Sequence, residues 1–360
     1  MTHRHTTVIA LGLAGLLAAA AAAEMRAIVT KGPDSAKGKP VILHEDGTWE
    51  LAGAPASTSR RLRDKLSAGK VWGEHGTQTK QFFYPCGIAV DGSGNIYVAD
   101  KANHRIQVFS KKRRPLREWK VEFHPAGLAF GPDGALYVTT DASLQSPVVH
   151  VFDTKGKLLR AWGSAGKGDG QFDGQLGGVA VDGDGNVYVA DTFTHRIQKF
   201  DAQGIFLTQW GTLGSGEGEF NQPYNVAVDA DGQIYVTDAV NHRVQKFSSQ
   251  GRFLAAWGGK GTEDGQFWSP PRGLCVDGAG TIWTTATGGG MTQIQRFDAD
   301  GDFLMGWGHR DNGETYGLDG VEHGLCVLPS GRVYIADTVN HRIHNFNLSH
   351  SAAPRPGGPE

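Results

Sequence analysis

The stretch Asp238-Ala-Val-Asn-His-Arg-Val-Gln-Lys-Phe247 is the clearest guide to the architecture, because the chain repeats it four times in nearly the same form. The other three copies begin at Asp100, Asp191 and Asp337. The step from Asp191 to Asp238 is 238 − 191 = 47 residues. A fixed step of roughly 40 to 50 residues is typical of the blades of a β-propeller, in which each repeat forms one small sheet.

Each copy of the motif lies inside a longer unit with the pattern of four antiparallel strands. In the fourth repeat these are residues 224–228, 233–237, 243–247 and 252–257, separated by Asp- or Gly-containing turns. Short β-branched and aromatic runs between such turns are typical of hairpins, and four strands make one blade. The expected first strands number six, at residues 87–90, 127–130, 178–181, 225–228, 273–276 and 324–327. The sequence therefore predicts an all-β, six-bladed β-propeller of four-stranded antiparallel blades.

The last repeat lacks one strand, and the missing strand is found near the other end of the chain. The fourth strand of most repeats ends in Trp-Gly, at Trp162, Trp210, Trp257 and Trp307, but no such strand follows Phe346. Residues 70–73, Lys-Val-Trp-Gly, precede the first repeat and match this pattern. We expect this N-terminal strand to complete the last blade and close the ring, which protects the strand edges.

These motifs resemble the NHL repeats, a family of six-bladed propellers named for an Asn-His-Leu motif. The resemblance covers roughly residues 68–348, with repeats 2 and 5 departing from it at residues 141–150 and 286–291. It implies a module that acts by binding. NHL propellers of one branch bind RNA through a basic face. This chain has a formal net charge of −2, or −3 once Arg4 is removed with a leader, so no nucleic-acid partner is expected.

The ends of the chain predict export. Residues 1–23 read as a signal peptide, with Arg4, an apolar run over residues 8–23 and a small-residue cleavage site before Glu24. That run is shorter than the roughly 18 to 20 residues of a spanning helix, although an uncleaved anchor is the alternative. We expect a small β-hairpin segment and linker at residues 24–59, the propeller at 60–348 and a disordered tail at 349–360. Within the hairpin segment, residues 27–30 and 40–43 are the candidate strands. The predicted location is periplasmic or secreted, as a monomer without membrane insertion of the mature chain.

The charged and thiol-bearing residues have structural interpretations. The basic run at residues 111–114 falls at a turn between strands and is expected to be a solvated hairpin. Cys275 and Cys326 stand where other repeats have alanine, so we expect small buried thiols and no disulfide framework. The motif Asp, His and Arg recur once per blade and cannot converge on one ion, so they should hold the blade together. The turn at residues 182–186 resembles the start of a calcium loop but lacks its Glu, which indicates a hairpin turn.

Positions that differ between blades are the better candidates for a site. The residue just before each inner strand should ring the mouth of the central channel, and these residues are Cys86, Ala126, Gly177, Tyr224, Arg272 and His323. Cys86, Tyr224, Arg272 and His323 are the candidate ligand-binding residues. An aromatic ring, a fork of donors and an imidazole suit an anionic or carboxylate-bearing group. The alternative, that Arg272 and His323 only satisfy loop carbonyls, stays open.

A second resemblance bears on chemistry. Secreted peptidyl-amidoglycolate lyases are similar six-bladed propellers, and the resemblance implies zinc held by histidines at this ring position in alternate blades. His323 fits and is a weak metal candidate, but Ala126 and Tyr224 occupy the other two positions, and Gly324 stands where a catalytic Asp is expected. No cofactor is therefore expected, with zinc or calcium as alternatives, and no catalytic residue is assigned. We predict a binding module for a protein, peptide or glycan ligand. The alternative is a metal-assisted lyase or hydrolase acting at the same mouth.

Overall fold

The computed structural model describes residues 41–43, 49–51, 63–140, 148–174, 176–288, 291–308, 322–328 and 330–351. The chain divides into two units, residues 64–349 and residues 1–63 with 350–360. In the smaller unit, β1 (Val41–Leu43) pairs antiparallel with β2 (Trp49–Leu51). The partner expected for residues 40–43 was residues 27–30, which lie outside the described residues, as do residues 1–23 and 352–360. Among the residues described, no helix is long and apolar enough to cross a membrane.

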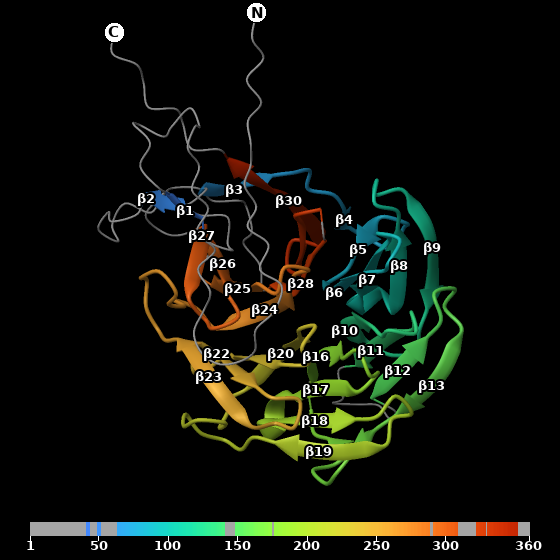
Figure 1. The fold of residues 1–360 in the computed structure, drawn as a ribbon. Coiled ribbons are helices and arrows are strands. Elements are labelled where there is room, and N and C mark those ends of the chain that lie inside the picture. Colours follow the sequence, from blue (N-terminus) through green and yellow to red (C-terminus); the bar gives the residue numbers. More distant parts are fainter. Residues whose placement is uncertain are drawn as a thin grey trace, which may run out of the picture. The chain divides into compact units, whose positions relative to one another are not determined.

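The larger unit is a ring of six four-stranded antiparallel sheets, which confirms the predicted fold (Figure 1). Blade 1 comprises β6 (Pro85–Val90), β7 (Ile96–Asp100), β8 (Arg105–Phe109) and β9 (Pro115–Lys120). Blade 2 comprises β10 (Pro125–Phe130), β11 (Leu136–Thr140), β12 (Val149–Phe152) and β13 (Leu158–Trp162). Blade 3 comprises β16 (Leu176–Val181), β17 (Val187–Asp191), β18 (Arg196–Phe200) and β19 (Phe206–Trp210).

The second half of the ring repeats this order. Blade 4 comprises β20 (Pro223–Val228), β21 (Ile234–Asp238), β22 (Arg243–Phe247) and β23 (Phe253–Gly258). Blade 5 comprises β24 (Pro271–Val276), β25 (Ile282–Gly288), β26 (Met291–Phe297) and β27 (Phe303–Trp307). Blade 6 comprises β28 (Glu322–Val327), β29 (Arg332–Asp337), β30 (Arg342–Ser351) and β3 (Arg63–Ala68). β30 thus continues past the boundary at residue 348 that the sequence suggested. Short parallel pairs precede two blades, β4 (Glu74–His75) with β5 (Gln81–Phe82) and β14 (Ser164–Ala165) with β15 (Gln171–Phe172).

The ring is closed by a strand from the N-terminal end of the propeller, as predicted. β3 is the outer strand of blade 6, beside β30. Trp72 lies opposite Ile343, and hydrogen bonds run in both directions at 3.0 and 2.8 Å. Trp210 faces Ile197 in the same way in blade 3. The sequence located the closing segment at residues 70–73, whereas the regular strand lies upstream, at Arg63–Ala68.

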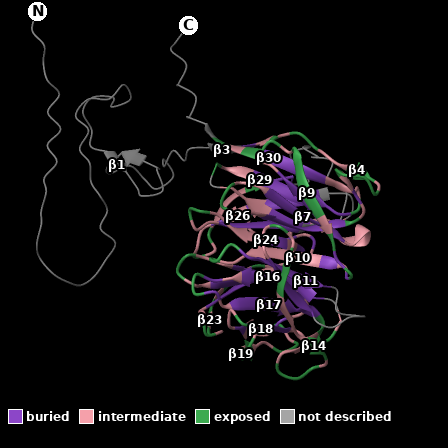
Figure 2. Cartoon of the chain, turned by 90° about the vertical axis from the view of Figure 1, so that its right-hand side faces the viewer, coloured by how far each residue is buried: buried purple, intermediate pink, exposed green. Residues whose placement is uncertain are grey.

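The apolar core lies in the seams between blades. The second strands of the blades, such as β7, are buried, whereas outer strands such as β9 are largely exposed, as Figure 2 shows. Four of the six seams, those between blades 1 and 5, also hold a tryptophan against a glycine of the next blade. A Cβ added to Gly251, at φ +80°, would lie 2.6 Å from the indole of Trp210. Glycine is therefore required at this turn both for its backbone conformation and for the space that the indole fills.

Candidate functional site

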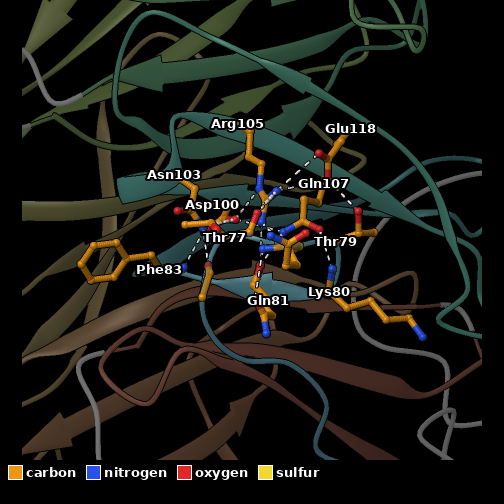
Figure 3. Close-up of polar contacts among 12 residues, drawn as sticks. Thr77, Thr79, Lys80, Gln81, Phe83, Asp100, Asn103, Arg105, Gln107 and Glu118 are labelled. Carbon is orange, nitrogen blue, oxygen red and sulfur yellow. Dashed lines mark hydrogen bonds and ion pairs between the residues drawn. The ribbon is translucent and has the colours of Figure 1, made fainter.

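The aspartate of the repeated motif is the centre of a buried hydrogen-bond network (Figure 3). One carboxylate oxygen of Asp100 accepts the backbone N–H of Phe83 at 2.7 Å. The other accepts bonds from the side chains of Asn103, Arg105 and Gln107, at 2.9, 2.7 and 2.9 Å. Buried charge is stable only when it is paired and hydrogen-bonded in this way. The predicted structural role of the motif aspartates is confirmed.

The motif arginine fixes the loop that leads into the inner strand. The remaining N–H groups of Arg105 donate to the carbonyl oxygens of Thr77, Gln78 and Gln81, at 2.8 to 2.9 Å. Arg196 and Arg243 hold the corresponding loops of blades 3 and 4 through the same three kinds of contact. The motif therefore makes a rigid frame for the loops at this face of the ring.

The motif histidine joins neighbouring blades. His104, His195, His242 and His341 all have left-handed backbone conformations, with φ between 52° and 58°. Nδ1 of His341 accepts the backbone N–H of Tyr84 at 3.1 Å, and Nδ1 of His195 accepts that of Gln222 at 3.1 Å. These imidazoles are thus engaged with the backbone of the next blade. Within the described part of the chain, no three His, Cys, Asp or Glu side chains form a group that could hold a metal ion.

Blade 2 departs from the motif and contains a buried histidine that sequence reasoning did not single out. Thr140 stands in place of the motif aspartate, and His150 occupies the position of Gln107. His150 stacks on Phe123 with ring centroids 3.9 Å apart, and its Nδ1 has no hydrogen-bond partner among the described residues. Burial lowers the pKa of His150 to about 4. Only its alignment with the glutamines of the other blades could have drawn attention to it.

A cavity of about 730 Å³ lies along the axis of the ring, lined by residues from all six inner strands. This volume is within the range of small-molecule pockets. The walls are mainly alanine, valine, leucine and glycine. Polar and aromatic residues line it too, namely Tyr84, Lys101, His124, Phe130, Tyr224, Asn225, Arg272 and Thr338. The site thus combines a mainly apolar wall with a few polar groups.

The six ring positions are equivalent, as the sequence predicted. Each is the second residue of its inner strand, at or beside the shift in register between the first two strands. Tyr224 and Arg272 come together, with the guanidinium carbon 5.0 Å from the centre of the phenol ring. Cys86 also lines the cavity, but its buried thiol donates to the carbonyl of Pro125 at 3.2 Å, in the seam with blade 2. His323 occupies the equivalent place in β28, and its side chain lies outside the description.

The other two thiols belong to the channel wall. Cys275 and Cys326 are both half-buried, line the cavity and are free, as is Cys86. Burial raises the pKa of Cys326 to about 12 and holds that of Cys275 well above its usual value. Both therefore carry neutral thiols at neutral pH. Cys275 and Cys326 thus line the channel at the alanine positions, and the expectation that both would be buried is wrong because they face the cavity.

Exposed apolar side chains lie on the motif turns and just before the first inner strand, and sequence reasoning did not identify them; two of them, Tyr84 and Val339, line the cavity. Phe193, Val240 and Val339 occupy the same place in three motif turns, two residues after the aspartate, and are 50%, 43% and 48% exposed. Tyr84, 43% exposed, precedes the first inner strand. We call these four the rim residues. The only signal in the sequence was an apolar residue in an otherwise polar turn.

A protein-family model confirms the nature of the repeats. The NHL repeat model matches residues 82–109, 175–200, 220–247 and 323–346. The chain is an NHL-repeat β-propeller. Protein brain tumor of Drosophila melanogaster is 29% identical over 149 residues, covering 39% of this chain and 13% of that protein. NHL repeat-containing protein 3 of Mus musculus is 30% identical over 114 residues, covering 29% of this chain and 33% of that protein. The matched part of this chain therefore spans no more than a third of these relatives' length.

Solved structures share the fold at low sequence identity. A streptogramin B lyase has a TM-score of 0.53 at 15% identity, covering 86% of this chain and 87% of that one. A gluconolactonase from Xanthomonas campestris has a TM-score of 0.55 at 16% identity, covering 75% of this chain and 87% of that one. Identity this low shows a common propeller fold and nothing about activity.

Proposed function

We propose that this NHL propeller is a binding module that takes a protein or peptide ligand on the face around the channel mouth. The observation that carries the proposal is the set of rim residues. Four large apolar side chains are exposed on this face, and two of them, Tyr84 and Val339, line the cavity; buried Asp–Arg networks hold the loops in place. Exposed apolar side chains gathered on one face of a protein are typical of interaction sites. A glycan ligand would depend less on such groups.

A second feature supports the same face. Rigid loops lose little conformational entropy on binding, so more of the contact energy appears as affinity. The motif arginines of blades 1, 3 and 4 each fix three carbonyls of such a loop. The outer strands also expose apolar side chains, such as Leu207 on β19, but these lie away from the cavity and its polar mouth.

To test the proposal, peptides that bind this protein are selected from a random library, in which each peptide is displayed within a carrier protein. The affinity of the selected peptides is then measured for variants of this protein. We expect Phe193→Ala combined with Val240→Ala to weaken the selected peptides at least about tenfold, since truncating anchors costs about 1 to 2 kcal/mol. Leu207→Ala is the matched control, because Leu207 is 48% exposed on an outer strand. Equal losses in both variants, or selection of peptides that ignore Phe193 and Val240, would place the binding face elsewhere.

We also propose export of the protein, on the basis of residues 1–23 and their small-residue cleavage site. N-terminal sequencing of protein from its native compartment should find Glu24 as the first residue. A product that still begins at Met1 in the cytoplasm would reject this location.

The metal-assisted lyase or hydrolase remains a prediction from sequence, because no described feature favours it over binding. Such an enzyme would need a set of metal ligands at the mouth of the channel. His323 is the candidate, and the described residues around it supply no group of three ligands. Metal analysis of the purified protein, with His323→Ala as the comparison, would test it directly.

A further inference from the structure

We propose that His104 and His124 together bind a transition-metal dication of the Zn²⁺ and Cu²⁺ class, at the seam between blades 1 and 2. This inference goes beyond the proposed peptide-binding function and does not depend on it. Three features carry it: the closeness of the two imidazoles, the ring nitrogen that each of them presents, and the presence of a histidine just before the inner strand of blade 2.

The first feature is the position of the two rings. His104 follows the 3₁₀ helix η2 (Lys101–Asn103) in the motif turn of blade 1, and His124 is the last residue before β10 of blade 2. The two side chains are half-buried, and their ring centroids lie 4.2 Å apart with 42° between the ring planes. Zn–N bonds are about 2.0 to 2.1 Å long, so two nitrogens on one ion lie at most about 4.2 Å apart. The spacing of the rings is therefore compatible with ligation of one ion by both.

The second feature is the tautomer of each ring. Nδ1 of His104 lies 3.1 Å from the carbonyl oxygen of Phe123, and Nδ1 of His124 lies 3.3 Å from that of Lys101. A carbonyl oxygen only accepts hydrogen bonds, so each Nδ1 must donate. In a neutral imidazole the lone pair then belongs to Nε2. A metal-ligating histidine commonly has this form, with its other N–H held by a carbonyl oxygen. Both rings thus present the lone pair that a metal ion needs.

The motif histidines of two other seams have the opposite tautomer. Nδ1 of His341 and of His195 accepts the backbone N–H of Tyr84 and of Gln222. In their neutral form these imidazoles therefore carry the hydrogen on Nε2. His75 also lies close to His341, with ring centroids 4.6 Å apart. That second pair of histidines does not suit a metal ion, because Nδ1 of His341 is engaged and its Nε2 is protonated.

The third feature is the residue that precedes the inner strand of the next blade. His124 has this position in blade 2, whereas blades 1, 4 and 5 have Tyr84, Gln222 and Pro270. His242 in blade 4 also donates from Nδ1, to the carbonyl oxygen of Phe267 at 2.9 Å, but no histidine precedes β24. Among the described seams, only that between blades 1 and 2 combines this tautomer with a second imidazole.

The chemistry of the pair indicates which ion it takes. Imidazole suits Zn²⁺, Cu²⁺ and Ni²⁺, whereas Ca²⁺ and Mg²⁺ prefer oxygen ligands. In the described part of the chain, no third His, Cys, Asp or Glu joins the two in a group that could hold an ion. The remaining ligand positions therefore belong to water or to a donor atom of a bound molecule. His124 lines the axial cavity, so the ion would lie at the edge of that cavity.

The experiment is calorimetric titration of the untagged, metal-free mature protein with ZnCl₂. We expect His124→Gln to weaken binding at least about tenfold, because loss of even an outer-shell partner costs about 10- to 100-fold in metal affinity. Glutamine is the residue that blade 4 has at this position, at Gln222. His104→Asn should weaken binding to a similar extent. Asparagine is chosen because it tolerates the left-handed backbone of residue 104, where φ is 52°.

Two variants serve as controls. His242→Asn changes a motif histidine with the same tautomer and a φ of 55°, but without a second histidine beside it. His75→Ala removes the other histidine pair. Both should bind Zn²⁺ like the parent protein. Paramagnetic resonance of bound Cu²⁺ gives an independent measurement, and it should show two imidazole nitrogens in the parent protein and one in His124→Gln.

Several outcomes would overturn the inference. The pair is not a metal site if Zn²⁺ does not bind at millimolar concentration, or if the parent protein, His104→Asn and His124→Gln bind it equally. Loss of binding in His323→Ala alone would assign the ion to the channel position of blade 6. If His242→Asn weakens binding as much as His104→Asn does, the loss comes from disturbed seams and not from a lost ligand.

Discussion

At the scale of single residues, the motif aspartate stabilises each blade that has one. In blade 4, Asp238 is fully buried and accepts bonds from the backbone N–H of Asn221 and the side chains of Asn241, Arg243 and Gln245. Blades 2 and 5 have Thr140 and Ala286 at this place and lack the ion pair. The network is therefore a device for ordering one loop, and it can be absent from a blade whose loop differs.

Replacing Asp238 by asparagine should destabilise the fold by about 3 kcal/mol, because it leaves the guanidinium of Arg243 largely buried without its carboxylate. Urea denaturation monitored by tryptophan fluorescence would measure the loss. Asp231→Asn is the control: Asp231 is exposed on the turn between β20 and β21, so this change should stay within about 0.5 kcal/mol. Equal midpoints for the two variants would show that the network contributes nothing to stability.

The sequence predicted the roles of repeated residues better than those of unique ones. A residue that recurs once per blade most simply serves the blade, and the contacts of Asp100, Arg105 and His104 agree with that argument. Tyr224 and Arg272 line the axial cavity, and their role as ligand-binding residues stays a prediction. Cys86 was read as a mouth residue because the pattern cannot show that its thiol turns into a seam. His150 and Phe193 were missed, since burial and exposure depend on neighbours distant in sequence.

At the scale of strands, closure depends on β3. This strand supplies the outer edge of blade 6, and Leu66 is buried with Trp307 and Phe346 in the seam between blades 5 and 6. Trp72 adds a second attachment, against Ile343, and packs on Phe109 of blade 1 at 4.7 Å. The N-terminal segment therefore ties blade 6 to both of its neighbours.

Truncation tests how much β3 and Trp72 together contribute to the stability of the ring. A chain that begins at residue 61 keeps β3 and should melt like the mature protein. A chain that begins at residue 76 loses β3 and Trp72, exposes the edge of β30 and should aggregate or melt far lower. Differential scanning calorimetry with light scattering would compare the two. Equal melting temperatures would mean that β3 does not hold the ring closed.

The strands themselves were predicted closely, and the discrepancies have a common cause. Each inner strand was expected to begin at its small residue, such as Gly87, but it begins two residues earlier, at Pro85. Pro85 pairs with Asp100 ahead of an irregularity in register, and the alternation used to find strands breaks there. The closing strand was located by the Trp-Gly pair at Trp72. The regular strand upstream, Arg63–Ala68, carries no such pair, so the sequence pattern did not reveal it.

At the scale of the whole molecule, the described groups with lowered pKa values resist protonation in the fold. Burial lowers the pKa of His150 to about 4, and burial together with the neighbouring His75 lowers that of His341. Burial alone would raise the pKa of Asp337, but hydrogen bonds from His344, Arg342 and Asn340 hold it below its usual value. The unfolded chain takes up these protons more readily, so each of these groups makes the ring less stable as pH falls.

As pH falls, the loss of stability caused by the histidines should appear before the loss caused by Asp337. An unfolded histidine takes up a proton near pH 6.5, whereas His150 in the fold does so only near pH 4, so stability should decline between these values. A shift of this size corresponds to about 3 kcal/mol at full development. His150→Gln carries the residue that blades 1, 3 and 4 have at this position, at Gln107, Gln198 and Gln245. Urea midpoints measured from pH 7 to pH 4 should fall less steeply for this variant, while His341 and Asp337 titrate alike in both proteins. Parallel curves would show that His150 is protonated in the fold as readily as in the unfolded chain.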